Sequence, residues 1–344
     1  MIGLRRFERQ RGVAVITALL LTTLAITIVA SLFWQQQVQV RSIENQRTQL
    51  QKQWILRGAL DWAKLILRSD TNQVDYAGDP WAIPLAEVRL DEFVENGKQD
   101  AEATSAVLSG YIVDAQSRFN LLTLLRGGSA SPQDVAAFAR LLENLRIASA
   151  ATLAQSTADY LLAARMPGLI VPVTPIVPVG SNTAAAAGGN ANVTLSTNPA
   201  GPRMMMLTQV DDLLAVPGFT AELVTQLKDF VTVLPTGDSK TNVNTASAEV
   251  LSAVVPGLSF SDATALVASR DRAYFKDMAD FTNRLPSTVL SAKGFTGLPA
   301  LDVKTEHFLV NGKVKLNNAV LEIQSLVNRP VIGGPVKVLW TREN

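Results

Sequence analysis

The chemistry open to this chain is limited by a single histidine and the absence of cysteine. Hydrolase triads need a general base, usually histidine, and zinc sites are built mainly from histidine and cysteine. His307 stands at the start of a predicted strand, and we interpret it as a surface or sheet-edge side chain. The sequence also lacks a glycine-rich loop of the kind that cradles phosphate. We therefore expect no enzymatic activity and no catalytic residue.

Carboxylates could still hold a metal ion, and calcium is the cation that such oxygen ligands suit. The spaced aspartates of an EF-hand loop do not occur in the sequence. The candidate calcium ligands are Asp211, Asp212 and Asp238, with Asp277 and Asp280 in the same region. Each is more often a helix cap or part of a solvated helix face than a calcium ligand. No cofactor is therefore certain, calcium stays open, and the metal ligands are unknown.

Two segments that contain Val-Pro-Gly, Leu213–Thr220 and Leu251–Leu258, look alike. Each predicts a helix, a tight turn and a second helix, which resembles a helix-hairpin-helix pair. Such pairs bind DNA phosphates through backbone N–H groups and nearby cations. Residues 204–290, however, hold six basic and ten acidic side chains, a net charge of −4 that opposes nucleic acid. The charge favours packing units or a protein-binding surface, and a membrane-anchored periplasmic DNA-binding protein is kept as the alternative function.

Near the N-terminus, Val13 to Trp34 runs for 22 residues without a charge. At ~1.5 Å rise per residue such a helix spans about 33 Å, close to the ~30 Å hydrocarbon core of a bilayer. Four arginines and one glutamate precede it, which favours a cytoplasmic N-terminus. We expect a single membrane pass with the bulk of the chain on the far side.

Three interpretations of this segment compete. A cleaved secretory signal would have an apolar run of about 7–15 residues ending in small residues, and this run is longer and ends in Ser-Leu-Phe-Trp. A plain single-pass anchor is the second interpretation. The third is a prepilin-type leader, residues 1–12, cut between Gly12 and Val13 with the apolar run retained. The basic stretch and the small residue before the junction suit the third, and the junction alone leaves the last two open.

Beyond Trp34 the pattern stays helical to Ser69 but becomes amphipathic, with apolar residues recurring near the helical period. One helix from Val13 to Ser69 would be ~85 Å long, its first half in lipid and its second half on a globular body. The alternative is a break near Gln35–Gln37.

The remaining elements alternate in kind. Strands are predicted at Val107–Asp114, Glu306–Leu316, Ala319–Asn328 and Val336–Thr341, and helices at Leu121–Leu125, Pro132–Met166 and within 204–290. The Pro-, Ala- and Gly-rich stretch 167–203, which is uncharged as far as Pro202, predicts a long exposed loop. Asn311-Gly312 and Asn317-Asn318 compete as the turn between two strands, and we prefer the second, with Gly312 as a bulge. The strands can form one antiparallel sheet with the helical region inserted between them.

Together these parts resemble the K-type minor pseudopilin of bacterial type II secretion systems, the general secretion pathway protein K family. The resemblance runs nearly end to end and rests on RGVAVITALL at Arg11–Leu20, SLFW at Ser31–Trp34, DPWA at Asp79–Ala82, GYIVDAQSRFNL at Gly110–Leu121, NVNTA at Asn242–Ala246, and His307–Val310 continuing to Leu326–Arg329.

The resemblance implies an α+β fold: a pilin-like long N-terminal helix packed on an antiparallel sheet, with a large, mainly helical inserted domain containing the helix-hairpin-helix-like repeats. The implied divisions are a cleaved leader (1–12), a transmembrane half-helix (13–34), the helix and first strand of the pilin body (35–118), the insert (119–303, including the loop 167–203) and the C-terminal strands (304–344).

The resemblance also implies a role and partners. The subunit would sit at the pseudopilus tip, help start assembly, and serve the export of folded proteins across the outer membrane. It would be anchored in the inner membrane with a periplasmic body. The I- and J-type minor pseudopilins would complete a heterotrimeric tip complex, with the H-type minor and G-type major pseudopilins as further partners and no nucleic acid. Prepilin peptidase would cut after Gly12 and N-methylate Val13.

Assembly would involve Val13, Ala14, Ile16 and Thr17. Ordinary pilin-type subunits have Glu at the fifth mature position, where its carboxylate can pair with a neighbour's terminal ammonium; here that position is Thr17. A subunit that cannot make this pairing fits a place with no subunit beyond it. Family members also often carry acidic calcium-binding clusters in the insert. In the corresponding stretch here, residues 150–189, the only acidic residue is Asp159.

Overall fold

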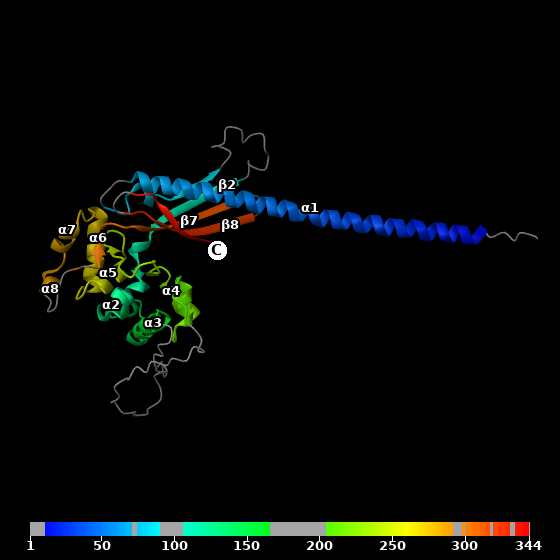
Figure 1. The fold of residues 1–344 in the computed structure, drawn as a ribbon. Helices are drawn as coiled ribbons and strands as arrows, with labels where there is room; N and C mark the ends of the chain where they lie inside the picture. The colour runs from blue at the N-terminus through cyan, green and yellow to red at the C-terminus, as the bar shows by residue number, and fades with distance from the viewer. Residues whose placement is uncertain are drawn as a thin grey trace, which may run out of the picture.

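The computed structural model describes residues 11–70, 74–89, 106–165, 204–291, 298, 300–316, 319–330 and 334–343. Most of the predicted leader 1–12, the predicted loop 167–203 and the predicted turn Asn317-Asn318 lie outside the described residues. In Figure 1 one very long helix extends from a mixed body of sheet and helices.

That helix, α1, runs from Arg11 to Ser69 without interruption, so the single predicted helix is confirmed and the break near Gln35–Gln37 is not. Its first part projects away from the body (Figure 1), and the most apolar window has a mean hydropathy of 2.5 with none of it buried. Its last part packs on the sheet, where Leu56, Ala63 and Leu67 are buried. One helix therefore has a free apolar half and a half fixed to the body.

The sheet has five antiparallel strands in the order β1-β2-β7-β8-β9, namely Leu85–Arg89, Ala106–Asp114, His307–Leu316, Ala319–Asn328 and Lys337–Glu343. The four predicted strands are confirmed, and β1 was not predicted. Leu316 pairs with Ala319, as two long strands require. Gly312 pairs in regular register with both Gly110 and Ile323, so the predicted bulge is wrong. A glycine facing the helix gives room instead, since a Cβ there would lie 3.2 Å from Leu56 Cδ2.

The insert lies between β2 and β7, as predicted. Its described α-helices are α2 Pro132–Asn144, α3 Ala150–Arg165, α4 Ala221–Leu227, α5 Ala248–Val254, α6 Phe260–Arg272, α7 Met278–Asn283 and α8 Ser287–Leu290. Its 3-10 helices are η4 Ala115–Ser117, η5 Leu121–Gly128 and η6 Val210–Ala215. Two short parallel strand pairs join β3 Phe119–Asn120 to β4 Val231–Thr232 and β5 Thr241–Asn242 to β6 Leu301–Asp302. The predicted helix 132–166 is broken between α2 and α3, where Arg146 and Ser149 both have φ of 58°.

The two Val-Pro-Gly segments do form turns between helices. Gly218 (φ 98°) lies between η6 and α4, and Gly257 (φ 79°) lies between α5 and α6. A positive φ suits glycine because it has no Cβ. The first unit starts with a 3-10 helix and the second with an α-helix, so the two are only locally alike. That they are helix-hairpin-helix motifs stays a prediction.

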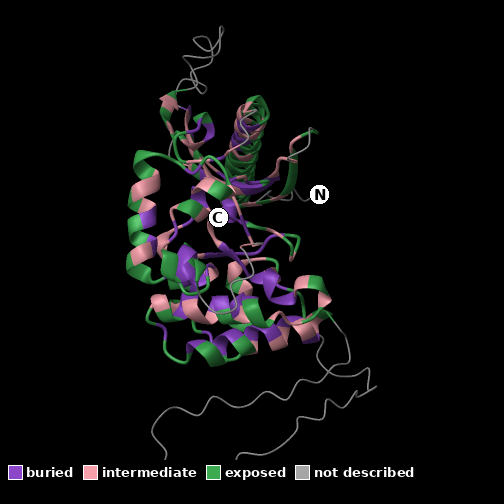
Figure 2. Ribbon diagram, turned by 90° about the vertical axis from the view of Figure 1, so that its left-hand side faces the viewer, coloured by how far each residue is buried: buried purple, intermediate pink, exposed green. Residues whose placement is uncertain are grey.

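Two main cores hold the chain together (Figure 2). The insert has its own large core, which includes Phe138, Phe275 and Phe281. The body core joins Leu67 of α1 to the sheet and to Trp81, which lies in the short 3-10 helix η1 (Pro80–Ala82) and meets the Phe308 ring edge-on at 5.1 Å. Because the two cores are separate, the position of the insert on the body depends on the contacts between them.

Candidate functional site

The predicted assembly residues lie on the free half of α1. Val13 and Ile16 are 62% and 60% exposed, and Ala14 and Thr17 are also exposed. The Thr17 hydroxyl donates to the carbonyl oxygens of Val13 and Ala14, both at 3.0 Å. Because lipid offers no hydrogen-bond partner, a hydroxyl closed onto its own helix suits a membrane-spanning segment. The side chains are thus open to lipid or to another helix.

Two of the three candidate calcium ligands have other roles in the structure. Asp211 pairs with Lys228 at 2.7 Å. Asp212 caps η6, accepting hydrogen bonds from the backbone N–H groups of Thr208 and Gln209 at 2.7 and 3.0 Å. Asp238 is exposed. Within the described part of the chain, these carboxylates do not belong to any cluster of three metal-ligating groups.

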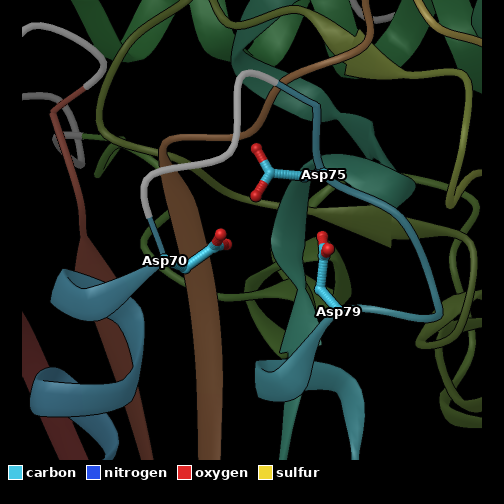
Figure 3. Close-up of side chains that lie close together, drawn as sticks. All are labelled: Asp70, Asp75 and Asp79. Atoms are coloured by element: carbon cyan, nitrogen blue, oxygen red, sulfur yellow. The ribbon is translucent and has the colours of Figure 1, made fainter.

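A cluster that the sequence did not suggest is formed by Asp70, Asp75 and Asp79, whose carboxylate oxygens lie within 4.8 Å of one another. Figure 3 shows them converging from the end of α1, the following loop and the residue before η1. Arg329 pairs with two of the three carboxylates, with Nη1 2.8 Å from Asp70 Oδ2 and Nη2 bonded to Asp75 Oδ1. Asp79 accepts from Trp81 Nε1 at 3.2 Å. The cation that three acids attract is therefore supplied by the chain itself.

Asp75 also couples this cluster to the rest of the molecule. Its Oδ2 accepts from the Thr305 N–H at 2.8 Å, and its carbonyl oxygen accepts from Asn242 Nδ2 of the insert at 3.0 Å. Burial raises the pKa of Asp75 to about 6, against the opposing attraction of Arg329 and the Thr305 hydrogen bond. The ion pair thus sits in a poorly solvated joint.

The centre of that joint is Asp114, at the end of β2, whose carboxylate is buried. Oδ1 accepts from the Gln116 N–H and Thr305 Oγ1, both at 2.7 Å. Oδ2 accepts from Asn242 Nδ2 at 2.9 Å and Thr245 Oγ1 at 2.5 Å. Burial raises the pKa of Asp114, and the four donors oppose that rise. Since a buried carboxylate needs such donors, body and insert are linked by one satisfied polar network.

His307 belongs to the same joint, which corrects its predicted place on the surface or at a sheet edge. It is 6% exposed, because β7 is flanked by β2 and β8 and the insert covers its first residues. Gln116 Oε1 lies 3.4 Å from its Nδ1 and accepts from its backbone N–H at 3.2 Å. Burial lowers the pKa of His307 to about 4. A neutral, buried imidazole here is structural and has no nucleophile beside it among its hydrogen-bond partners.

Four of the six motifs on which the resemblance rests therefore meet in space, although they are far apart in sequence. Residues 241–303 match the family model described as type II secretion system (T2SS), protein K. A type II secretion system protein K of Pseudomonas aeruginosa is 30% identical over 334 residues, covering 93% of this chain and 89% of that protein. The chain belongs to the protein K family of type II secretion systems. The protein K of Aeromonas hydrophila is 24% identical, covering 88% of this chain and 87% of that protein.

Among solved structures, the GspK-GspI-GspJ complex from enterotoxigenic Escherichia coli matches with a TM-score of 0.60 and 19% identity, covering 88% of this chain and 98% of the matched chain. The likeness confirms the predicted α+β fold of long helix, antiparallel sheet and helical insert. This protein K is accordingly a minor pseudopilin of type II secretion, from a structural family that is not known for enzymes. Its apolar helix is consistent with the inner-membrane anchoring of that family.

Proposed function

We propose that this pseudopilin caps the tip of the pseudopilus, forms a complex with the I- and J-type minor pseudopilins, and helps start assembly for the export of folded proteins. The observation that carries the proposal is Thr17, whose hydroxyl is closed onto its own helix by bonds to Val13 and Ala14. The matched E. coli structure is that of a GspK-GspI-GspJ complex, and this supports the choice of partners.

The physical reason concerns a charge in lipid. A carboxylate at the fifth mature position would need a neighbouring ammonium, because an unpaired charge in the membrane costs several kcal/mol. Thr17 brings no charge and therefore needs no neighbour on that side. A subunit of this kind can end a filament without leaving a buried charge unpaired.

Processing and topology form part of the same proposal. Prepilin peptidase cuts between Gly12 and Val13 and methylates the new terminal amine, with the N-terminus cytoplasmic and the body periplasmic. The test is intact-mass analysis of the membrane form, with loss of residues 1–12 and gain of one methyl group as the expected result. A mass for the uncut chain in cells with active peptidase would contradict this.

The partners are tested by co-purification of the full chain, in detergent, with tagged I- and J-type pseudopilins from the same bacterium. We expect a complex that contains both. Thr17→Glu tests the tip role: it should reduce secretion by placing an unpaired carboxylate in lipid, whereas Thr17→Val should be tolerated. Equal secretion by both variants would show that Thr17 does not mark a tip subunit. Absence of the complex together with measurable DNA affinity would favour the alternative of a DNA-binding protein.

A further inference from the structure

A small hollow lies inside the insert, where its first segments meet the loop between β4 and β5. Three of the side chains that line it are cationic, Arg118, Arg126 and Lys240, and one is acidic, Asp134. The hollow measures about 10 Å³, which is room for roughly one body of the size of a water molecule. It therefore suits a single-atom ion and is too small for an organic ligand.

Arg126 brings a buried nitrogen without a partner to this hollow. Its Nε lies 3.2 Å from Asp134 Oδ2. Its Nη2, alone among the buried side-chain polar atoms of the described residues, has no hydrogen-bond partner. Buried polar atoms are nearly always paired, and an unpaired N–H of a charged group is costly. Arg126 thus keeps a cationic donor that the described part of the chain does not satisfy.

Arg118 provides a second guanidinium of the same kind. It donates no hydrogen bond to the residues that the structure describes, and its ion-pair partner Asp229 is 88% exposed and lies 3.9 Å from Nη2. That distance is too long for a hydrogen bond. Burial lowers the pKa of Arg118, and the attraction of Asp229 opposes this effect. A charge that is poorly solvated and weakly paired therefore lines the hollow beside Arg126.

The acceptors at the hollow favour an anion over a water molecule. Asn120 Oδ1 already accepts from two backbone N–H groups, at 3.2 and 3.0 Å. Gln116 Oε1 also accepts from two, at 2.6 and 3.2 Å. Asp134 Oδ2 is bonded to Arg126. A water molecule needs acceptors for its hydrogens, whereas an anion needs donors alone. The unpaired donors of two arginines supply what an anion requires.

We propose that this hollow binds a chloride ion at the guanidinium groups of Arg118 and Arg126. Chloride is a single atom that accepts several N–H donors at once, and it brings negative charge to a place where cations outnumber acids. Lys240, paired with Asp302 at 3.0 Å, adds to the positive field. The ion ties the start of the insert to the loop between β4 and β5. The site does not depend on the assembly role proposed above.

Chloride NMR of the wild-type chain tests binding directly. The full chain is kept in a non-ionic detergent and chloride is titrated. A chloride ion held by the protein relaxes faster than a free one, so its line should broaden, and added bromide should displace it and restore the narrow line. Broadening no greater than with detergent alone would mean that the hollow holds an ordered water only, and would overturn the proposal.

Arg118→Met tests the location. The substitution breaks no hydrogen bond to a described residue, and it should reduce chloride affinity about tenfold. Arg272→Met, which removes an exposed arginine of α6, is the control for loss of charge. At equal ionic strength, wild type and Arg272→Met should melt at a higher temperature in sodium chloride than in sodium gluconate, whose anion is too large for the hollow. Arg118→Met should lose this difference.

Two outcomes of the melting experiment count against the site. Equal chloride stabilisation of Arg118→Met and wild type would place the ion elsewhere and overturn the proposal. Equal melting temperatures of wild type in the two salts would do the same. If Arg118→Met does not fold, the wild-type titration with bromide displacement decides the question by itself.

Discussion

The outward face of α1 and the joint around Asp114 differ in almost every physical respect. On α1, side chains as large as Trp54 are exposed, and the polar Thr17 bonds only to its own helix. In the joint, charged side chains are buried, and each carboxylate oxygen of Asp114 accepts hydrogen bonds from two donors. The outward face of α1 thus carries an exposed apolar stripe, made of Ile43, Leu50, Trp54 and Leu65. The polar groups of the joint, in contrast, find their hydrogen-bond partners within the chain.

This difference separates two kinds of function within one subunit. A satisfied buried network fixes the angle between body and insert, because each donor has one geometry in which all bonds form. An exposed apolar stripe contributes nothing to the fold until a partner covers it. Substitutions in the joint should therefore change stability, and substitutions on the stripe should change assembly alone.

The largest effect is expected from Asp114→Ala. It removes the acceptor of four buried hydrogen bonds, including those from Asn242 and Thr245, and should lower the free energy of unfolding by about 4 kcal/mol. Urea unfolding of the full chain, followed by circular dichroism, measures this. Asp238→Ala, at an exposed carboxylate, is the matched control. Similar losses for the two variants would show that the network does not hold the joint.

Arg329→Met comes next. It leaves Asp70 and Asp75 without their guanidinium and should cost about 3 kcal/mol, the range for breaking a buried pair. The cluster of three carboxylates within 4.8 Å then loses the positive charge of Arg329, so calcium should raise the melting temperature of the variant and leave wild type unchanged. Lys240→Met, which breaks the more exposed pair with Asp302, is the control. Equal calcium stabilisation of wild type and variant would contradict the role given to Arg329.

The pH dependence should contain two opposed contributions. The pKa of Asp75 is raised from 3.8 to about 6, so its contribution to stability is present below pH 3.8 and is lost as pH rises through about 6. The pKa of His307 is lowered from 6.5 to about 4, so its contribution is present above pH 6.5 and is lost as pH falls through about 4. Burial is the main cause of both shifts. The two slopes have opposite sign over the same window and therefore oppose each other in wild type.

Single variants expose each slope. His307→Gln should leave stability falling from pH 4 to 6 by about 2 kcal/mol, and the raised pKa of Asp114 acts in the same direction. Asp75→Asn should leave stability falling less with pH than in His307→Gln, because the rising contribution of His307 then opposes that of Asp114. Urea titrations at several pH values measure both. Equal slopes in the two variants would show that the assignment to these residues is wrong.

The elements with strong periodicity could be predicted from the sequence, and the joint could not. The long helix and four strands follow from apolar spacing in the chain. Strand β1, LAEVR, is only five residues long and half exposed, so it has little pattern. The break between α2 and α3 depends on positive φ at Arg146 and Ser149. Because neither residue is glycine, the sequence does not indicate a break there.

The site residues show the same limit. Asp114 meets Thr305 and Asn242 across 191 and 128 positions of sequence, and no local pattern encodes such a pairing. His307 was placed at the surface because a strand end gives no sign of what covers it. Four of the resemblance motifs contain residues of the joint, but a match in sequence does not show that these segments meet in space. The Arg329 cluster likewise needed the fold to bring residue 329 to the end of α1.

The smallest stability effect, and the sharpest contrast, is expected on the stripe. Trp54→Ser and Leu65→Ser should change the free energy of unfolding of the isolated chain by less than about 0.5 kcal/mol, because both side chains are already mostly exposed. Leu67→Ser on the opposite side of the same helix is the matched control: it is fully buried and should cost at least about 3 kcal/mol. In the assembled complex the order should change, since a partner that covers Trp54 makes that side chain as necessary as Leu67. If Trp54→Ser proves as destabilising as Leu67→Ser in the isolated chain, the stripe already has a cover within the subunit, and the distinction between a self-sufficient joint and a surface awaiting its partner fails.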